Sequence, residues 1–121
     1  MALLEGMPFP ASYQTSPGFD VIAVNGAFAR AFPGVGAGGN VMVWMLVDPR
    51  ARVVMEDWER EAHIMVQAFR HMAAGFVDPG RIAEITRMCA ESPDWERLWG
   101  TDISVVDLTW RPVRIRPLEG G

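Results

Sequence analysis

The stretch VMVWMLVDPRARVVMEDWE, residues 41–59, is the most informative part of the chain for the fold. In it an uninterrupted apolar run is followed by residues that are typical of helix starts. Seven apolar residues run from Val41 to Val47, and Asp48-Pro49 follows them directly. Aspartate before proline is typical of a helix start, with proline in the first helical position. We therefore predict a short buried helix over 41–47, capped by Asn40, and a second over Pro49–Met55. Periodicity over so few residues leaves a strand open as the alternative for the apolar run.

A long amphipathic helix is expected directly after this stretch. Asp57 stands at its cap position, and Glu59 and Glu61 fall in the first turn, where the helix dipole favours negative charge. Apolar residues then recur every three or four positions until Gly75. The spacing predicts a helix from Trp58 to Ala74, whose inward face consists of Trp58, Ala62, Met65, Val66, Phe69, Met72 and Ala73.

Extended segments are predicted on the N-terminal side of this centre. Ser12–Thr15 and Phe19–Val24 suit two strands, and Ser16-Pro17-Gly18 between them is favourable turn chemistry. The second strand is apolar on both faces, so we expect both faces to be covered. Asn25 is placed to cap a short helix that continues through Phe32.

Two more helices and further strands are predicted on the C-terminal side. Asp78-Pro79 starts a helix to about Ala90, with Ile82, Ile85, Met88 and Cys89 inward, and Ser92-Pro93-Asp94 starts one through Trp99 and Gly100. From Ile103 onward, apolar and polar residues alternate, which indicates strands. The expected fold class is α+β, with a block of helices between early and late strands of an antiparallel sheet.

The glycine-rich segment Gly34–Gly39 satisfies the G-x-G-x-x-G spacing of dinucleotide-binding proteins. That spacing has its meaning only when a strand leads into the loop and a helix leaves it. Here the preceding segment is predicted to be helical and ends at Pro33. A flexible connecting loop or a pocket lid is the better interpretation.

Composition narrows the class of protein. The length of 121 residues fits one domain. The net charge of −4 argues against binding of nucleic-acid phosphates by the chain itself. A single cysteine, Cys89, excludes an intrachain disulfide, and the N-terminus lacks the pattern of a signal peptide, so we expect a cytoplasmic protein. The seven-residue apolar run is far shorter than the roughly 20 residues of a membrane-spanning helix.

Neither a metal site nor an active site is predicted. His63 and His71 are eight residues apart on one helix, about 12 Å along its axis, which is too far for one metal ion. The acidic residues around position 57 are explained by capping and the helix dipole, and Cys89 by burial in a helix. We therefore expect no catalytic residue, no metal ligand and no enzymatic function.

Methionine and tryptophan are unusually frequent, with eight and five residues. Methionine fills irregular apolar space and adapts to different partners. Each of these side chains taken singly is best explained as core. Together they suggest an apolar pocket between the helices and the sheet.

Several motifs together resemble a known family. FDVIAVNGAFARAF (19–32), DPRARVVMEDWEREA (48–62), SPDWERLW (92–99) and RPV (111–113) are similar to the MmyB-like ligand-binding domain, the PAS-like sensor half of bacterial helix-turn-helix transcription regulators. The resemblance covers about residues 8–115. It implies a PAS-like fold and an apolar cavity for a long-chain fatty acid or similar lipid, whose occupancy is relayed to an attached DNA-binding domain.

The chain departs from that pattern in three places. It contains no helix-turn-helix module, so DNA would be reached only through an attached domain. Val43 stands where relatives often have an arginine, which predicts a more apolar wall, and Arg111 replaces the usual histidine before Pro112. The chain also ends at Gly121, before the family's last strands, and an open sheet edge would favour a homodimer.

The leading hypothesis is a ligand-sensing domain of a bacterial transcription regulator that binds a hydrophobic small molecule, with no cofactor other than a bound fatty acid. The alternative is a ligand-free dimerisation or interaction module with the same aromatics in core and interface. Arg30 or Arg70 are the candidates for a carboxylate head group. The predicted pocket residues are Phe28, Val41, Trp44, Met45, Met65, Phe69 and Trp99.

Overall fold

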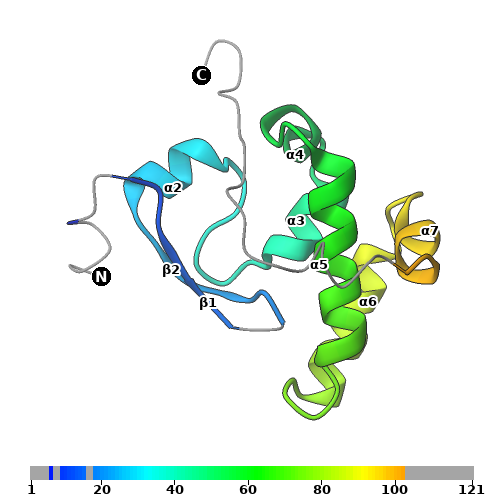
Figure 1. Cartoon of the computed structure of the whole chain (residues 1–121). Helices are drawn as coiled ribbons and strands as arrows, with labels where there is room; N and C mark the ends of the chain where they lie inside the picture. The colour runs from blue at the N-terminus through cyan, green and yellow to red at the C-terminus, as the bar shows by residue number, and fades with distance from the viewer. Residues whose placement is uncertain (1–5, 7–8, 16–17, 103–121) are drawn as a thin grey trace.

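The computed structural model of the chain describes residue 6, residues 9–15 and residues 18–102. The turn at Ser16-Pro17 and the strands predicted from Ile103 onward, with Arg111, lie outside the described residues. The elements, shown in Figure 1, are β1 (Ser12–Gln14), β2 (Val21–Val24), α2 (Gly26–Ala31), α3 (Val41–Val47), α4 (Pro49–Val54), α5 (Trp58–Met72), α6 (Pro79–Cys89) and α7 (Trp95–Gly100).

The two strands form an antiparallel pair with Ser12 opposite Val24 and an irregular register after Tyr13. The prediction that β2 is covered on both faces is wrong at Ile22, which is 60% exposed, whereas Val21 is 4% exposed. Successive side chains of a strand point to opposite faces, and it is Val21 that joins the core cluster. The α+β class is confirmed, while the PAS-like arrangement of the sheet depends on the late strands and stays a prediction.

The end of the glycine-rich loop is held against β2. The Val21 amide donates to the Gly39 carbonyl at 2.9 Å, and the Gly38 amide donates to the Val21 carbonyl at 3.0 Å. The next bond runs from the Val41 amide to the Phe19 carbonyl at 2.9 Å. The expected flexible loop is therefore fixed along β2 in its second half. Since a helix leads into the loop, the dinucleotide-binding geometry is not formed.

The predicted helix starts at residues 41 and 49 are confirmed. Asn40 Oδ1 accepts from the Val43 amide at 3.0 Å, and Asp48 Oδ1 accepts from the Arg50 amide at 2.9 Å. Asp57 occupies the cap position of α5 without a capping bond from its side chain, because its backbone (φ −122°, ψ 63°) departs from the extended cap conformation.

One residue of the predicted inward face of α5 points outward. Met72 is 47% exposed, because it stands in the last turn, where α5 extends beyond α3 and the strands (Figure 1). The predicted burial of Ile85 and Cys89 in α6 is confirmed, with both side chains 0% exposed. Burial raises the pKa of the Cys89 thiol to about 12, so this thiol is inert at neutral pH.

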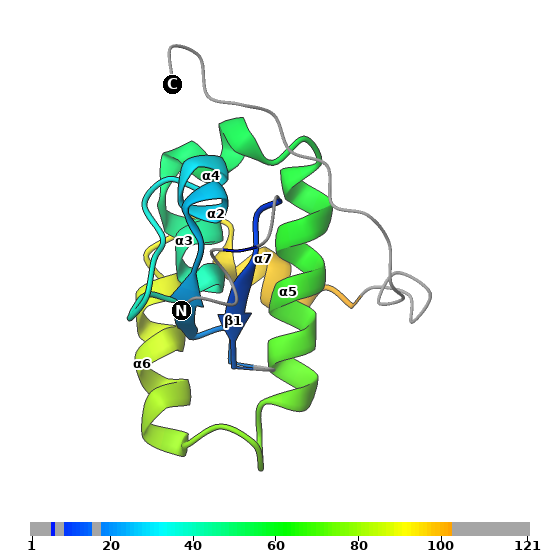
Figure 2. The same ribbon diagram turned by 90° about the vertical axis from the view of Figure 1, so that its left-hand side faces the viewer.

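The strands and α2 lie on one side of the molecule, and α5, α6 and α7 lie on the other, with α3 between them (Figure 1). In Figure 2, seen from the strand side, α3 and α6 stand on one flank and α5 on the other, with β1 in front. Helix α3 packs against α4, α5 and α6, and α7 packs against α5. Among the described helices, none has the length and apolar content that crossing a membrane requires.

Candidate functional site

A cavity of about 180 Å³ lies where the strands and α2 face α3 and α5. It draws its walls from β1, α2, the glycine-rich loop, α3, the residue after α4, and α5. Eight of the ten described lining residues are apolar. The lining consists of Gln14, Phe28, Phe32, Val35, Val41, Trp44, Met45, Met55, Glu61 and Met65.

One wall of the cavity is an aromatic row with fixed geometry. The rings of Phe28 and Phe32 lie 4.7 Å apart, and Phe32 meets Trp44 edge-on at 5.9 Å and 85°. The indole Nε1 of Trp44 donates to the Pro33 carbonyl at 2.8 Å. Because a buried indole needs an acceptor, this bond sets the plane of the Trp44 ring.

A second part of the lining consists of three methionines from three different segments: Met45 of α3, Met55 after α4 and Met65 of α5. Met45 and Met55 are buried and Met65 is half-buried. Helix α3 is joined to α5 by a bond from Trp58 Nε1 to the Met45 carbonyl at 2.7 Å. The backbone at this wall is thus anchored, while the unbranched methionine side chains retain freedom to rearrange.

Asn25 fixes the position of α2 at the edge of the cavity. Its Oδ1 accepts from the Phe28 amide at 2.8 Å and from the Ala11 amide at 3.0 Å, and its Nδ2 donates to the Phe9 carbonyl at 2.8 Å. The side chain is 2% exposed. The predicted helix cap therefore also binds the chain segment before β1, which the spacing alone does not reveal.

Asn40 caps α3 and also connects the start of this helix to the segment before β2. Its Nδ2 donates to the Gly18 carbonyl at 2.8 Å and to Asp20 Oδ1 at 3.0 Å. Asp20 in turn binds Arg81 of α6, with 2.5 Å between Oδ1 and Nη2. The hydrogen bond from Arg81 lowers the pKa of the Asp20 carboxyl group below its ordinary value. These bonds connect the segment before β2, the start of α3 and α6.

A larger, open groove of about 640 Å³ shares Val35 and Trp44 with the cavity. It contains two arginines, Arg50 and Arg81, each already bound to an aspartate, with 2.7 Å between Arg50 Nη2 and Asp48 Oδ2. Val43, which was expected to make the pocket wall more apolar, lines this groove and not the cavity. Its lining is Gly34, Val35, Gly38, Gly39, Asn40, Val43, Trp44, Val47, Asp48, Pro49, Arg50, Arg81 and Met88.

The cavity is the better candidate for an apolar ligand. A hydrophobic compound gains free energy in proportion to the apolar surface that leaves water, and the groove stays open to solvent. Both arginines of the groove are already paired with an aspartate, which weakens their attraction for a further anion. The cavity removes more of a ligand from water and presents fewer polar groups to it.

Both histidines lie within hydrogen-bonding distance of oxygen atoms of the protein. His63 Nε2 lies 2.5 Å from the Thr101 carbonyl, and His71 Nε2 lies 3.1 Å from Gln67 Oε1. Within the part of the chain that the structure describes, no three histidine, cysteine or acidic side chains come together as a metal site would require.

Comparison with known proteins gives this geometry its context. Residues 1–118 match the MmyB-like transcription regulator ligand binding domain, which is nearly the whole chain. The chain belongs to this family. It is therefore a ligand-binding domain of a transcription regulator, and this family is not typically enzymatic. No curated protein and no solved structure matches the chain.

The MmyB-like domain brings together five of the seven predicted pocket residues. Phe28, Val41, Trp44, Met45 and Met65 all line the cavity, from α2, α3 and α5. Ligand binding by these five residues stays a prediction.

The other two predicted pocket residues lie elsewhere. Phe69 is 1% exposed in the core, and Trp99 packs on Trp95 with 5.1 Å between ring centroids. Neither candidate arginine lines the cavity. Arg70 instead donates from Nη1 to the Trp99 carbonyl at 2.7 Å, and Arg30 stands in the last turn of α2.

Sequence reasoning missed three apolar lining residues of the MmyB-like domain. Phe32 and Met55 belong to the set of aromatic and methionine residues that suggested a pocket, but each stands at the end of a short helix. Val35 lies in the glycine-rich loop, and no periodic pattern marks it. It is 6% exposed because the loop folds back onto β2.

Proposed function

We propose that this domain senses a hydrophobic small molecule with an aliphatic chain, bound in the cavity beside Trp44. The observation that supports the proposal is a lining of eight apolar side chains contributed by sequence-distant segments. Each methylene group that the cavity removes from water contributes about 0.8 kcal/mol. Fatty acids, which the sequence resemblance suggests, are the first class to test.

The size of the cavity bears on the length of the ligand. About 180 Å³ is below the range of roughly 300–1,000 Å³ that is common for ligand pockets. Taking about 30 Å³ for a water-sized group, it accommodates about six such groups. A short chain fits the cavity as it stands, whereas a long-chain fatty acid requires the methionine wall to move. Methionine side chains allow that movement at small cost.

We further propose that occupancy is relayed to an attached helix-turn-helix domain in the bacterial cytoplasm. The cavity touches α2, α3 and α5 at once, so a ligand that displaces the methionines changes how these helices pack. Contact with DNA belongs to the attached domain, in keeping with the net charge of −4 here.

Mass spectrometry under native conditions, with lipid extraction and thermal-shift measurements, tests the proposal. Hexanoate, octanoate, dodecanoate and palmitate, with the matching alcohols, form the series of ligands. We expect at least one member to raise the melting temperature, and Met65→Trp, which fills the cavity, to abolish that rise. Met88→Trp, at the groove and not the cavity, is the matched control. No bound lipid together with no thermal shift across both series would refute the function.

A second candidate function, a dimerisation module, is supported by exposed apolar side chains. Phe76, in the turn after α5, is 82% exposed, and Met72, in the last turn of α5, is 47% exposed. Exposed apolar side chains of this size favour burial against a second protein surface. Sedimentation equilibrium of the protein and of Phe76→Ser distinguishes the two functions. A dimer that Phe76→Ser dissociates, combined with no ligand binding, would favour this candidate.

A further inference from the structure

The apolar side chains that line the cavity are mostly of two kinds. Of the eight, three are aromatic and three are methionines, whereas only Val35 and Val41 are branched aliphatic residues. Leucine and isoleucine are absent from the described lining. The composition of the lining therefore indicates a class of ligand, beyond its apolar character. The aromatic and methionine residues are Phe28, Phe32, Trp44, Met45, Met55 and Met65.

The aromatic side chains distinguish a ligand ring from a saturated group of the same size. Each ring has a negative face and a positive edge, so two rings attract each other when they are offset or edge-on. Phe32 and Trp44 already form such a contact, with 5.9 Å between ring centroids. Because Trp44 is also bound to the Pro33 carbonyl, a ligand ring meets an indole whose orientation is set before binding. A saturated chain gains only apolar burial from the same side chains.

The methionines favour the same class of ligand. A thioether sulfur attracts an aromatic ring, often at the ring edge, at a separation of about 5 Å. Met45, Met55 and Met65 belong to three different segments of the chain. Their unbranched side chains can rotate to bring sulfur to the edge of a ring. Both kinds of lining side chain thus attract an aromatic ring more strongly than a saturated one.

The size of the cavity suits a single ring. Apolar protein cavities of about 150 Å³ are known to bind benzene. This cavity measures about 180 Å³, so a benzene ring with a short alkyl substituent fits while the methionines keep their places. A long saturated chain needs them to move. The volume and the chemistry of the lining therefore favour the same class of ligand.

We propose that the cavity selects a compact aromatic ligand, a benzene ring with a short alkyl substituent, over a saturated compound of the same size. This inference rests on the proposed function, because it specifies the ligand of the same cavity. The ring contacts the aromatic side chains and the methionines, and the alkyl substituent is the aliphatic chain of the ligand. Ring recognition thus becomes a determinant of the signal besides apolar burial.

Isothermal titration of the purified protein with 2-phenylethanol, 2-cyclohexylethanol and 1-octanol tests this selectivity. The first two alcohols have the same carbon skeleton and differ only in the saturation of the ring, and 1-octanol is the open-chain alcohol with equally many carbons. Partition out of water favours the saturated compounds, so a preference for the phenyl compound has to come from the lining. We expect 2-phenylethanol to bind about three- to tenfold more tightly than 2-cyclohexylethanol, which corresponds to one aromatic pair.

Two variants of the lining assign the preference to this cavity. Met65→Leu removes a sulfur and Phe32→Leu removes a ring, and both keep an apolar side chain in place. Each should lower the ratio of the two affinities by at least about twofold. Met88→Leu makes the same exchange at the groove, so it is the matched control and should leave the ratio unchanged. Circular dichroism confirms that each variant is folded.

The outcomes separate this inference from the proposed function. Equal or tighter binding of 2-cyclohexylethanol by the unmodified protein, or an unchanged ratio in both lining variants, would overturn the selectivity alone. Binding of none of the three alcohols, nor of any member of the fatty acid series, would overturn the proposed function with it.

Discussion

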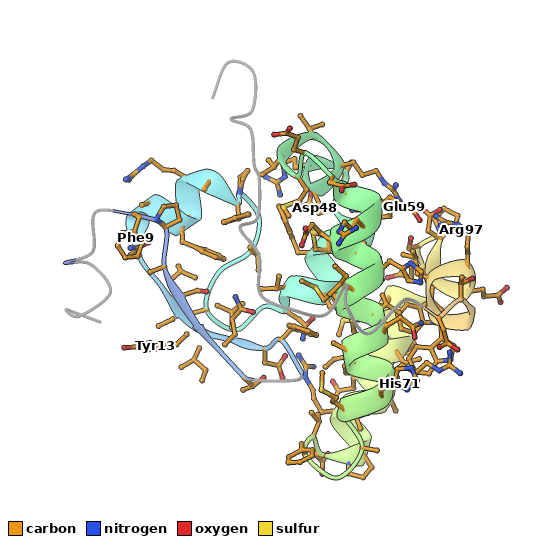
Figure 3. The ribbon with its side chains drawn as sticks, viewed as in Figure 1. Phe9, Tyr13, Asp48, Glu59, His71 and Arg97 are labelled. Carbon is orange, nitrogen blue, oxygen red and sulfur yellow. The ribbon has the colours of Figure 1, made fainter. Side chains whose placement is uncertain are left out.

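The two sides of α5 are held to the rest of the domain by different forces. On the α7 side, Arg97 binds Glu59, with 3.0 Å between Nη2 and Oε1, and Figure 3 shows these side chains close together across the two helices. Gln67, 1% exposed, donates to the carbonyls of Leu98 at 2.8 Å and Trp99 at 2.9 Å. On the strand side, apolar side chains surround a cavity.

This difference indicates which part of the domain responds to a ligand. Hydrogen bonds and ion pairs are directional, so they fix α7 in one position on α5. Dispersion contacts of methionine are weak individually and tolerate rearrangement. We therefore expect a bound ligand to shift the strands and α2 relative to α5, while α7 keeps its place. Changes on the α7 side should act on stability, and changes on the cavity side on binding.

The largest effect is expected from Phe69→Ala, in the core of α5. Phe69 is 1% exposed, and its truncation leaves a cavity that costs about 3–5 kcal/mol in the free energy of unfolding. Urea denaturation measures the loss. Met72→Ala on the same helix, at a position 47% exposed, is the control and should cost less than about 0.5 kcal/mol. Similar losses for both variants would contradict the assignment of Phe69 to the core.

Gln67→Leu should have the next largest effect. It removes one amide that serves two backbone carbonyls at the end of α7, which leaves both without this donor and costs about 2–3 kcal/mol. Gln67→Glu, of nearly the same shape but without the amide donor, should lose at least as much. A neutral result for both would show that α7 is held by packing alone. Ligand binding by the folded protein should not change.

Met65→Ala tests the side of α5 that faces the cavity. Met65 is half-buried, so we expect a loss of about 1–2 kcal/mol, with a change in ligand preference toward longer chains because the cavity grows. Calorimetric titration with 1-hexanol, 1-octanol and 1-dodecanol measures that change. Met88→Ala, at the groove, should leave the preference as it was. An unchanged series for Met65→Ala would exclude α5 from the binding wall.

The smallest effect is expected from the surface ion pairs between α5 and α7. Arg97 lowers the pKa of the Glu59 carboxyl group below its ordinary value and, together with Arg52, does the same for Asp94. Carboxylates with a lowered pKa stabilise the fold above their ordinary pKa, and this contribution is lost as the pH falls through the lowered values. Exposed pairs are screened by water, so the effect is small.

Melting temperatures from about pH 6 down to about pH 2 test this dependence. Arg97→Gln should lower the melting temperature slightly at neutral pH and should flatten its decline in acid, because Glu59 and Asp94 lose their main partner. Arg87→Gln on α6, at an exposed position, is the control. Identical acid profiles for Arg97→Gln and the unmodified protein would show that these ion pairs do not stabilise the contact between α7 and α5.

Local chemistry made the helix boundaries predictable. Asn25, Asn40 and Asp48 each accept from a backbone amide two or three residues later, which is a short-range interaction that sequence spacing encodes. Predictions that needed knowledge of the opposite surface were less successful. Ile22 and Met72 suit a buried face by their spacing, but are 60% and 47% exposed.

Met65 and Phe69 show what the sequence pattern predicts and what only the tertiary structure determines. They are four residues apart on one face of α5, so periodicity correctly places both toward the interior. What each one meets there depends on other segments. Phe69 is enclosed in the core, whereas Met65 reaches a space bounded by α2, α3 and the glycine-rich loop.

The sequence by itself determined the helix starts, the amphipathic faces and the family, because these follow from contacts between near neighbours along the chain and from the motifs themselves. The tertiary structure alone decided that Trp44 lines both a small apolar cavity and a larger open groove, and that Gln14 and Glu61, which are far apart in the sequence, line the same cavity. A side chain's direction is local, but the empty space before it is defined by everything that packs around it.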